Sequence, residues 1–202
     1  MERYLPTGNA FLSLPKINEK TAGIEDLTFL SMQHKGMIEI RGGEELPLAR
    51  PFLQADGHPL PLTQMQWSRD SFWLPVLKGK ARGIEFTMTI LTPIGERGFA
   101  IRMELAGEVQ SAITWGLEGC WESSWHCINE DKPLDGTMHC YESGWNHSIV
   151  FDFQCGAPMF AFAPMCDREI QSAFSKTDSG ISYTLTETFE LLPGGSHSAV
   201  FY

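Results

Sequence analysis

The sequence lacks any run of apolar residues that approaches the roughly 18 needed to cross a membrane. Its first residues, Met1–Tyr4, contain no apolar signal segment. Basic residues are also few, because 15 Lys and Arg stand against 25 Asp and Glu, for a formal net charge of −10. Nucleic acids and anionic membranes are bound by clustered basic side chains, so we expect neither as a partner. Neutral or weakly charged ligands remain compatible with this charge.

The cysteines follow no C-x2-C spacing and no disulfide framework. There are five of them: Cys120, Cys127, Cys140, Cys155 and Cys166. An odd count without such a framework is typical of a reducing compartment, so we expect a cytoplasmic protein. Two His-Cys pairs, 126–127 and 139–140, offer zinc-ligand types, but adjacent residues of a strand point to opposite faces. We therefore predict no metal site and no cofactor.

Motifs of nucleophilic and phosphate-transfer enzymes are missing as well. There is no G-x-S-x-G elbow, and Arg41–Glu45 lacks the lysine and the helix of a P-loop. Gly42 and Gly43 in that segment instead predict a hairpin turn. Glycoside hydrolysis needs two nearby carboxylates, and Glu118 and Glu122 on one strand face would lie about 13 Å apart. This separation is too large for the usual catalytic pair.

What the sequence does contain is a two-residue alternation of apolar and polar side chains, the period of a strand with one buried face. Turn residues separate the runs in which the alternation is clearest, which are 84–90, 99–105, 113–117, 149–153, 160–162 and 181–191. Helical spacing is not sustained anywhere, which argues against a parallel βαβ fold. The predicted fold class is all-β, a large antiparallel β-sandwich of supersandwich-like type with little helix.

Prolines and a Gly-Asn turn interrupt the start of the chain, so 1–35 is expected to be an irregular lead-in packed on the sandwich. A run at 24–33 within it is compatible with one helical turn or with a strand. Residues 36–202 are predicted to form the β-sandwich domain. The final Ser198–Tyr202 looks like a strand in progress, which suggests a fragment of a longer chain.

Several segments resemble the N-terminal β-domain of bacterial glucoamylase-like and glycogen-debranching-like glycoside hydrolases: Arg97–Leu105, His147–Phe153 leading to Pro158–Ala163, and Leu191–Ser196. The opening Leu5–Phe11 is similar to the lead-in of these enzymes. The resemblance implies a following (α/α)6 barrel, which carries the catalytic carboxylates, and a role in processing α-glucan-type sugars. It therefore implies no catalytic residue in this chain, and whether the chain alone is an enzyme stays open.

Aromatic rings interleaved with polar groups are the most suggestive local feature, because sugars stack on rings and offer hydroxyl groups to charged partners. The alternative is that these rings fill the core or an interface to another domain. The candidate carbohydrate or domain-interface residues are Trp67, Asp70, Trp73, Trp121, Glu122, Trp125 and His126.

Three functions are compatible with these features. We favour a noncatalytic module that packs on a catalytic barrel of the same chain, shapes its cleft and can contact oligosaccharide. The second is a free-standing mutarotase-like enzyme. Its acid–base groups would be one of His126, His139 and His147 with either Glu122 or Asp152. The third is a protein-interaction module without sugar binding.

Overall fold

The computed structural model describes residues 3–32, 35–62, 66–71, 73–127, 131–154, 158–165 and 169–202. Within these residues the chain is almost entirely β-strand, and every strand pairing is antiparallel. The predicted all-β class is therefore confirmed. The described part of the chain contains no helix with the length and apolar character that a membrane crossing requires.

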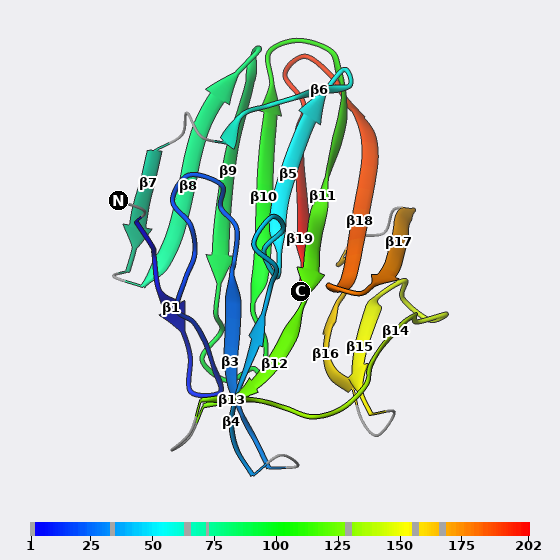
Figure 1. The fold of residues 1–202 in the computed structure, drawn as a ribbon. Helices are drawn as coiled ribbons and strands as arrows, with labels where there is room; N and C mark the ends of the chain where they lie inside the picture. Colours follow the sequence, from blue (N-terminus) through cyan, green and yellow to red (C-terminus); the bar gives the residue numbers. More distant parts are fainter. Residues whose placement is uncertain are drawn as a thin grey trace.

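Two five-stranded sheets form the body of the molecule (Figure 1). The first contains, in chain order, β7 (Gln66–Asp70), β8 (Leu74–Ala81), β9 (Ile84–Leu91), β10 (Ala100–Gly107) and β19 (Ser196–Phe201). The second contains β5 (Arg50–Ala55), β6 (His58–Pro59), β11 (Ser111–Trp121), β17 (Ile170–Thr177) and β18 (Gly180–Leu191). The spatial orders are β19-β10-β9-β8-β7 and β17-β18-β11-β5-β6.

The two sheets share one apolar core, because alternate side chains of their strands face each other. In β9 the even-numbered apolar residues Ile84, Phe86, Met88 and Ile90 are buried, as the two-residue alternation predicted. Across the sheets, the ring centroids of Trp115 in β11 and Phe201 in β19 lie 4.6 Å apart. Each such side chain contributes about 2 kcal/mol on burial, so the face-to-face packing is the main stabilising term.

A carboxylate lies inside this core. Glu187 of β18 is fully buried, and its Oε2 accepts a hydrogen bond of 2.9 Å from the indole Nε1 of Trp115. Nε2 of His197 in β19 lies 3.4 Å from the same oxygen, and the His197 ring packs on Phe189 with centroids 3.7 Å apart. Trp115 and Glu187 are opposite each other in the second sheet, so the contact with His197 makes Glu187 a polar connection between the two sheets.

A six-stranded sheet extends one end of the body. Its spatial order follows β1 (Thr7–Gly8), β2 (Leu12–Leu14), β3 (Asp26–Ser31), β4 (Gly36–Arg41), β12 (Ser123–His126) and β13 (Lys132–Pro133). β12 follows β11 almost directly, so this sheet continues from the second five-stranded sheet (Figure 1).

Two expectations for the N-terminal half are corrected by this sheet. The stretch 1–35 is not an irregular lead-in, because it contains β1, β2 and β3, and the boundary expected at 35/36 falls between the paired strands β3 and β4. The cause is the pairing of Leu27 with the buried Ile40, which gives the 24–33 run a strand partner. Gly42 and Gly43 do not form a hairpin turn, because β4 and β5 belong to different sheets.

A three-stranded sheet of β14 (Met138–Glu142), β15 (Ile149–Phe153) and β16 (Pro158–Phe162) packs beside β17 and β18 (Figure 1). Its aromatic side chains meet those of the body. Phe151 stacks on Phe160 with centroids 4.4 Å apart, and Phe160 meets the edge of Trp121 at 5.4 Å. Phe162 stacks on Tyr183 of β18 at 5.3 Å, so aromatic contacts join this sheet to the rest of the core.

Candidate functional site

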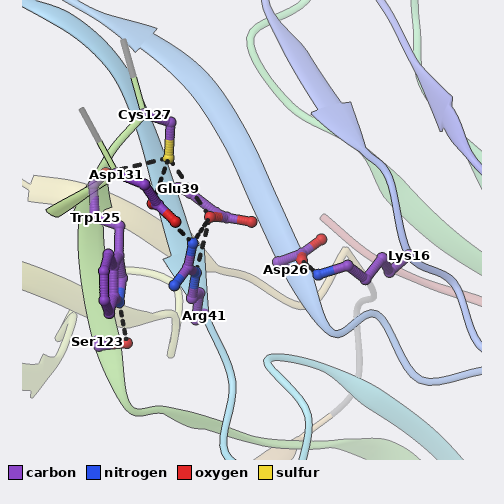
Figure 2. Close-up of polar contacts among 8 residues, drawn as sticks. All are labelled: Lys16, Asp26, Glu39, Arg41, Ser123, Trp125, Cys127 and Asp131. Atoms are coloured by element: carbon purple, nitrogen blue, oxygen red, sulfur yellow. Dashed lines mark hydrogen bonds and ion pairs between the residues drawn. The ribbon is translucent and has the colours of Figure 1, made fainter. Parts of the chain in front are cut away.

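The polar cluster of the molecule lies on the outer face of the six-stranded sheet. In β4 the side chains of Ile38 and Ile40 are buried, whereas Glu39 and Arg41 alternate with them and face outward. The strand register places Asp26 opposite Arg41, and Trp125 opposite Glu39. Directly opposite residues share a face of the sheet, so β3, β4 and β12 collect these groups in one place (Figure 2).

Arg41 is the centre of the cluster. Its Nε donates to Oε2 of Glu39 at 2.8 Å, and its Nη2 contacts the same oxygen and lies 3.2 Å from Oδ1 of Asp131. The guanidinium carbon lies 4.1 Å from the ring centroid of Trp125, whose Nε1 donates to Oγ of Ser123 at 3.0 Å. The guanidinium therefore covers one face of the indole ring (Figure 2).

Asp26 is the most deeply buried member of the cluster, with 2% of its surface exposed. Its Oδ2 accepts a hydrogen bond of 2.6 Å from Nζ of Lys16, whereas its Oδ1 is buried and accepts no hydrogen bond. Burial raises the pKa of Asp26, and the contact with Lys16 opposes this shift only in part. The charge of Glu39 and a side-chain hydrogen bond with it raise the pKa further.

Glu39 is shifted in the opposite direction. Burial by itself would raise its pKa, but the hydrogen bonds and the charge of Arg41 outweigh burial and hold the pKa of Glu39 below its ordinary value. The neighbouring carboxyl groups therefore differ in character, since Asp26 favours the neutral form and Glu39 the ionised form.

Three side chains of types that bind metal ions, Glu39, Cys127 and Asp131, lie close together here. The Sγ atom of Cys127 is 3.5 Å from Oε2 of Glu39 and 4.0 Å from Oδ1 of Asp131. Arg41 already bonds to both carboxylates, and burial raises the pKa of the Cys127 thiol, which favours the protonated form. The arrangement therefore favours an ion-pair network, and the absence of a metal site stays a prediction.

A groove of about 500 Å³ opens beside Asp26 and Arg41. Its three cationic side chains are paired with carboxylates, since Lys16 contacts Asp26, Arg41 contacts Glu39, and Arg50 contacts Glu118 at 2.7 Å. Four further carboxylates of the lining make no ion pair with any described residue; they are Glu25, Glu44, Glu45 and Glu122. The groove is therefore polar and carries excess negative charge.

A second groove of about 380 Å³ is more apolar. It includes Phe52 and Leu60 and shares Thr21 and Arg50 with the first groove. The two grooves are therefore neighbours along one side of the molecule. The first, with the outward-facing cluster beside it, is the candidate functional site.

The sequence-based candidates fall in three places. Trp67, Asp70 and Trp73 belong to the β7–β8 hairpin and line neither groove. The indole Nε1 of Trp67 donates to the carbonyl oxygen of Glu19 at 2.6 Å, whereas Trp73 is 47% exposed. None of these three residues is therefore part of the candidate site.

Trp121 is not a ligand-facing residue. It is fully buried, and its Nε1 donates to Oγ of Ser124 at 3.1 Å. It continues the inward-facing alternation of Ile113, Trp115 and Leu117 along β11, so the core interpretation is correct for this ring.

Two of the remaining candidates do join the site. Glu122 lines the groove, and Trp125 belongs to the cluster around Arg41. His126 is half-buried and follows Trp125 directly in β12, so its side chain points to the opposite face of the strand.

The histidines considered for acid–base chemistry lie away from both grooves. His147 bonds through Nδ1 to Oε1 of Glu142 at 2.7 Å in the exposed loop after β14, and His139 lies opposite Asp152 in β15. No histidine is part of the lining described for either groove.

The described cysteines also offer little nucleophilic chemistry. Cys120, Cys127 and Cys140 are free thiols, and burial raises the pKa of Cys140 to about 12. Cys155 and Cys166 lie outside the described residues.

The sequence-based reasoning did not identify Lys16, Asp26, Glu39 and Arg41. A signal for two of them was present, because Ile38-Glu39-Ile40-Arg41 alternates in the same way as the strands that were recognised. Comparison with protein-family models and with curated proteins gave no match. The function is therefore argued from the geometry.

Proposed function

We propose that this chain is a noncatalytic β-sandwich module of a carbohydrate-active enzyme that acts on α-glucan-type sugars. It packs on a helical (α/α)6 barrel and shapes one rim of the sugar cleft. The observation that carries the proposal is the groove beside Asp26, which is open and polar but has its three cations held in ion pairs. Such a lining suits contacts to hydroxyl groups and offers no activated nucleophile.

Exposed apolar side chains support a partner domain. Leu30 is 60% exposed and Met32 is 84% exposed, both at the β3–β4 end of the six-stranded sheet. Large apolar side chains gathered at one end of a sheet are typical of a surface that another domain covers. The helical barrel is that domain in this proposal.

The mutarotase-like alternative has less support, because its acid–base histidine would have to face a sugar-sized groove. His139 and His147 lie in or beside the three-stranded sheet, and His126 points away from the Trp125 side of β12. An anomer-exchange assay with common aldoses is expected to show no acceleration by the chain.

The proposal is tested by assaying the 202-residue chain for hydrolysis of maltooligosaccharides, and by translating the coding sequence that follows Tyr202. We expect no turnover, and several hundred further residues with helical periodicity. Robust turnover by the chain alone would contradict the noncatalytic role. A downstream sequence without helical periodicity would contradict the barrel.

A further inference from the structure

We infer that the groove beside Asp26 and Arg41 binds a neutral oligosaccharide through hydrogen bonds to the carboxylates of its lining. The choice of a neutral sugar rests on the proposed function. The groove itself contributes charges that argue against an anion, spread acceptors that argue against a single metal ion, and a volume and a buried polar atom that suit a small polar ligand.

The charges argue against an anionic ligand. Lys16, Arg41 and Arg50 are the cations of the lining, and each already contacts a carboxylate. Glu25 and Glu122 are among the four lining carboxylates that form no ion pair with a described residue. A phosphate or carboxylate ligand would therefore enter a field of its own sign.

The spacing of the carboxylates argues against a single metal ion. In the described part of the chain, the one compact group of three possible ligands is Glu39, Cys127 and Asp131, and Arg41 bonds to both of its carboxylates. The free carboxylates of the groove belong to no such compact group. Acceptors that are spread along a groove match a chain of hydroxyl groups instead.

Asp26 supplies an independent indication that the groove binds a polar ligand. Its side chain is 97% buried and lines the groove, and its Oδ1 accepts no hydrogen bond. An oxygen that accepts no hydrogen bond keeps unused acceptor capacity, so a ligand hydroxyl group that donates to it gains affinity. A hydroxyl group fits either protonation state of the carboxyl, because it can both donate and accept.

The neighbouring lysine can serve the same ligand. Nζ of Lys16 uses one of its three hydrogens on Asp26, and its side chain is 48% exposed. It can therefore donate to a ligand oxygen while it keeps its contact with Asp26. The volume of about 500 Å³ falls within the roughly 300–1,000 Å³ usual for small-ligand sites.

Gly43 offers a way to fill the groove without removing any native side chain. An added Cβ at this position would lie 3.5 Å from the Leu46 carbonyl oxygen and 3.8 Å from Oε1 of Glu122, which are ordinary contacts. A leucine at position 43 would therefore extend toward Glu122 and occupy the groove. Gly95 is a matched control, because an added Cβ there meets nothing within 4 Å.

The experiment is an NMR titration of the 202-residue chain with maltotriose and, separately, with cellotriose. We expect shifts of the groove amides with Kd on the order of 1 mM for at least one of the two sugars. Gly43→Leu should weaken binding at least about tenfold, and Glu122→Gln about threefold, whereas Gly95→Leu and Glu96→Gln should leave it unchanged.

Several outcomes would overturn the inference. These are the absence of shifts with both sugars, binding that Gly43→Leu leaves intact, and groove shifts produced by calcium chloride or sodium phosphate but by neither sugar. If Gly43→Leu does not fold, Glu122→Gln against Glu96→Gln decides the question. Sugar binding without turnover would support both proposals, whereas turnover with intact groove binding would contradict only the noncatalytic role.

Discussion

At the scale of single residues, Asp26 and Glu39 have opposite electrostatic environments. Burial raises the pKa of Asp26 above its ordinary 3.8, whereas Arg41 holds the pKa of Glu39 below its ordinary 4.5. The stability that Glu39 contributes is therefore present above pH 4.5 and is lost as the pH falls through its lowered pKa. For Asp26 the sign is reversed, and its contribution is lost as the pH rises through the raised pKa.

Asp26→Asn should therefore become increasingly favourable, relative to the unsubstituted chain, as the pH rises from about 4 to about 7. Asparagine resembles the neutral carboxyl group, can still accept from Lys16, and carries no charge that burial would penalise. Urea unfolding at three pH values measures the difference. Asp178→Asn, in the exposed turn before β18, is the control and should show no such trend. A difference that does not change with pH would show that folding does not raise the pKa of Asp26.

Part of the site was predictable at this scale. Glu122 and Trp125 were identified from the mixture of rings and charges, and both lie at the site. Asp26 and Lys16 could not be identified, because their pairing depends on a contact between the β2–β3 connection and β3 that has no local motif. Trp121 shows that counting alternate positions along a strand predicts burial more reliably than the local mixture of residue types does.

At the scale of elements, β11 is the central strand of the second five-stranded sheet. It pairs with β18 along its whole length and with β5 over residues 113–118. Gly116 lies in its middle, where an added Cβ would overlap the carbonyl oxygen of Leu185 and lie 2.9 Å from Cζ of Phe52. The absence of a side chain thus allows Phe52 to cover the strand.

Gly116→Ala should lower the free energy of unfolding by about 3 kcal/mol, because the overlapping atom of Leu185 belongs to the backbone of a paired strand and cannot move aside. Gly95→Ala, in the open β9–β10 turn, should change it by less than about 0.5 kcal/mol. Chemical denaturation followed by circular dichroism compares the two. Equal stability of both variants would show that β11 and β18 can shift enough to accept the added methyl group without a loss of unfolding free energy.

The strands were predictable where alternation was strong. The run 181–191 corresponds to β18, and 84–90 corresponds to β9. The pairing of β4 with β12 was not predictable, because the strands are far apart in the sequence and nothing local specifies the partner. For the same reason, 1–35 was expected to be irregular: β3 is recognisable as a strand only through its partner β4.

At the scale of the whole molecule, the buried group of Trp115, Glu187 and His197 connects the two five-stranded sheets. Trp115→Phe keeps an aromatic ring in the core but removes the indole N–H that donates to the Glu187 carboxylate. We expect a loss of about 2–4 kcal/mol, from the lost hydrogen bond to a buried acceptor and from the smaller ring.

Trp145→Phe provides the comparison, because this ring is 91% exposed and should change stability by less than about 0.5 kcal/mol. Urea unfolding curves of the two variants at neutral pH are the measurement. A loss of stability in Trp115→Phe no larger than that in Trp145→Phe would show that the hydrogen bond from Trp115 to Glu187 is dispensable.

The order of strands in space also constrains how the molecule is made. β10 pairs with β19, the last of the described strands, and β4 pairs with β12, which lies more than 80 residues further along the sequence than β4. On the ribosome, both early strands emerge long before their partners, and their open edges are exposed during that interval. Neither sheet can be completed until the segment with the late partner strand has left the exit tunnel, so a nascent chain of this protein is a natural client for chaperones that shield strand edges.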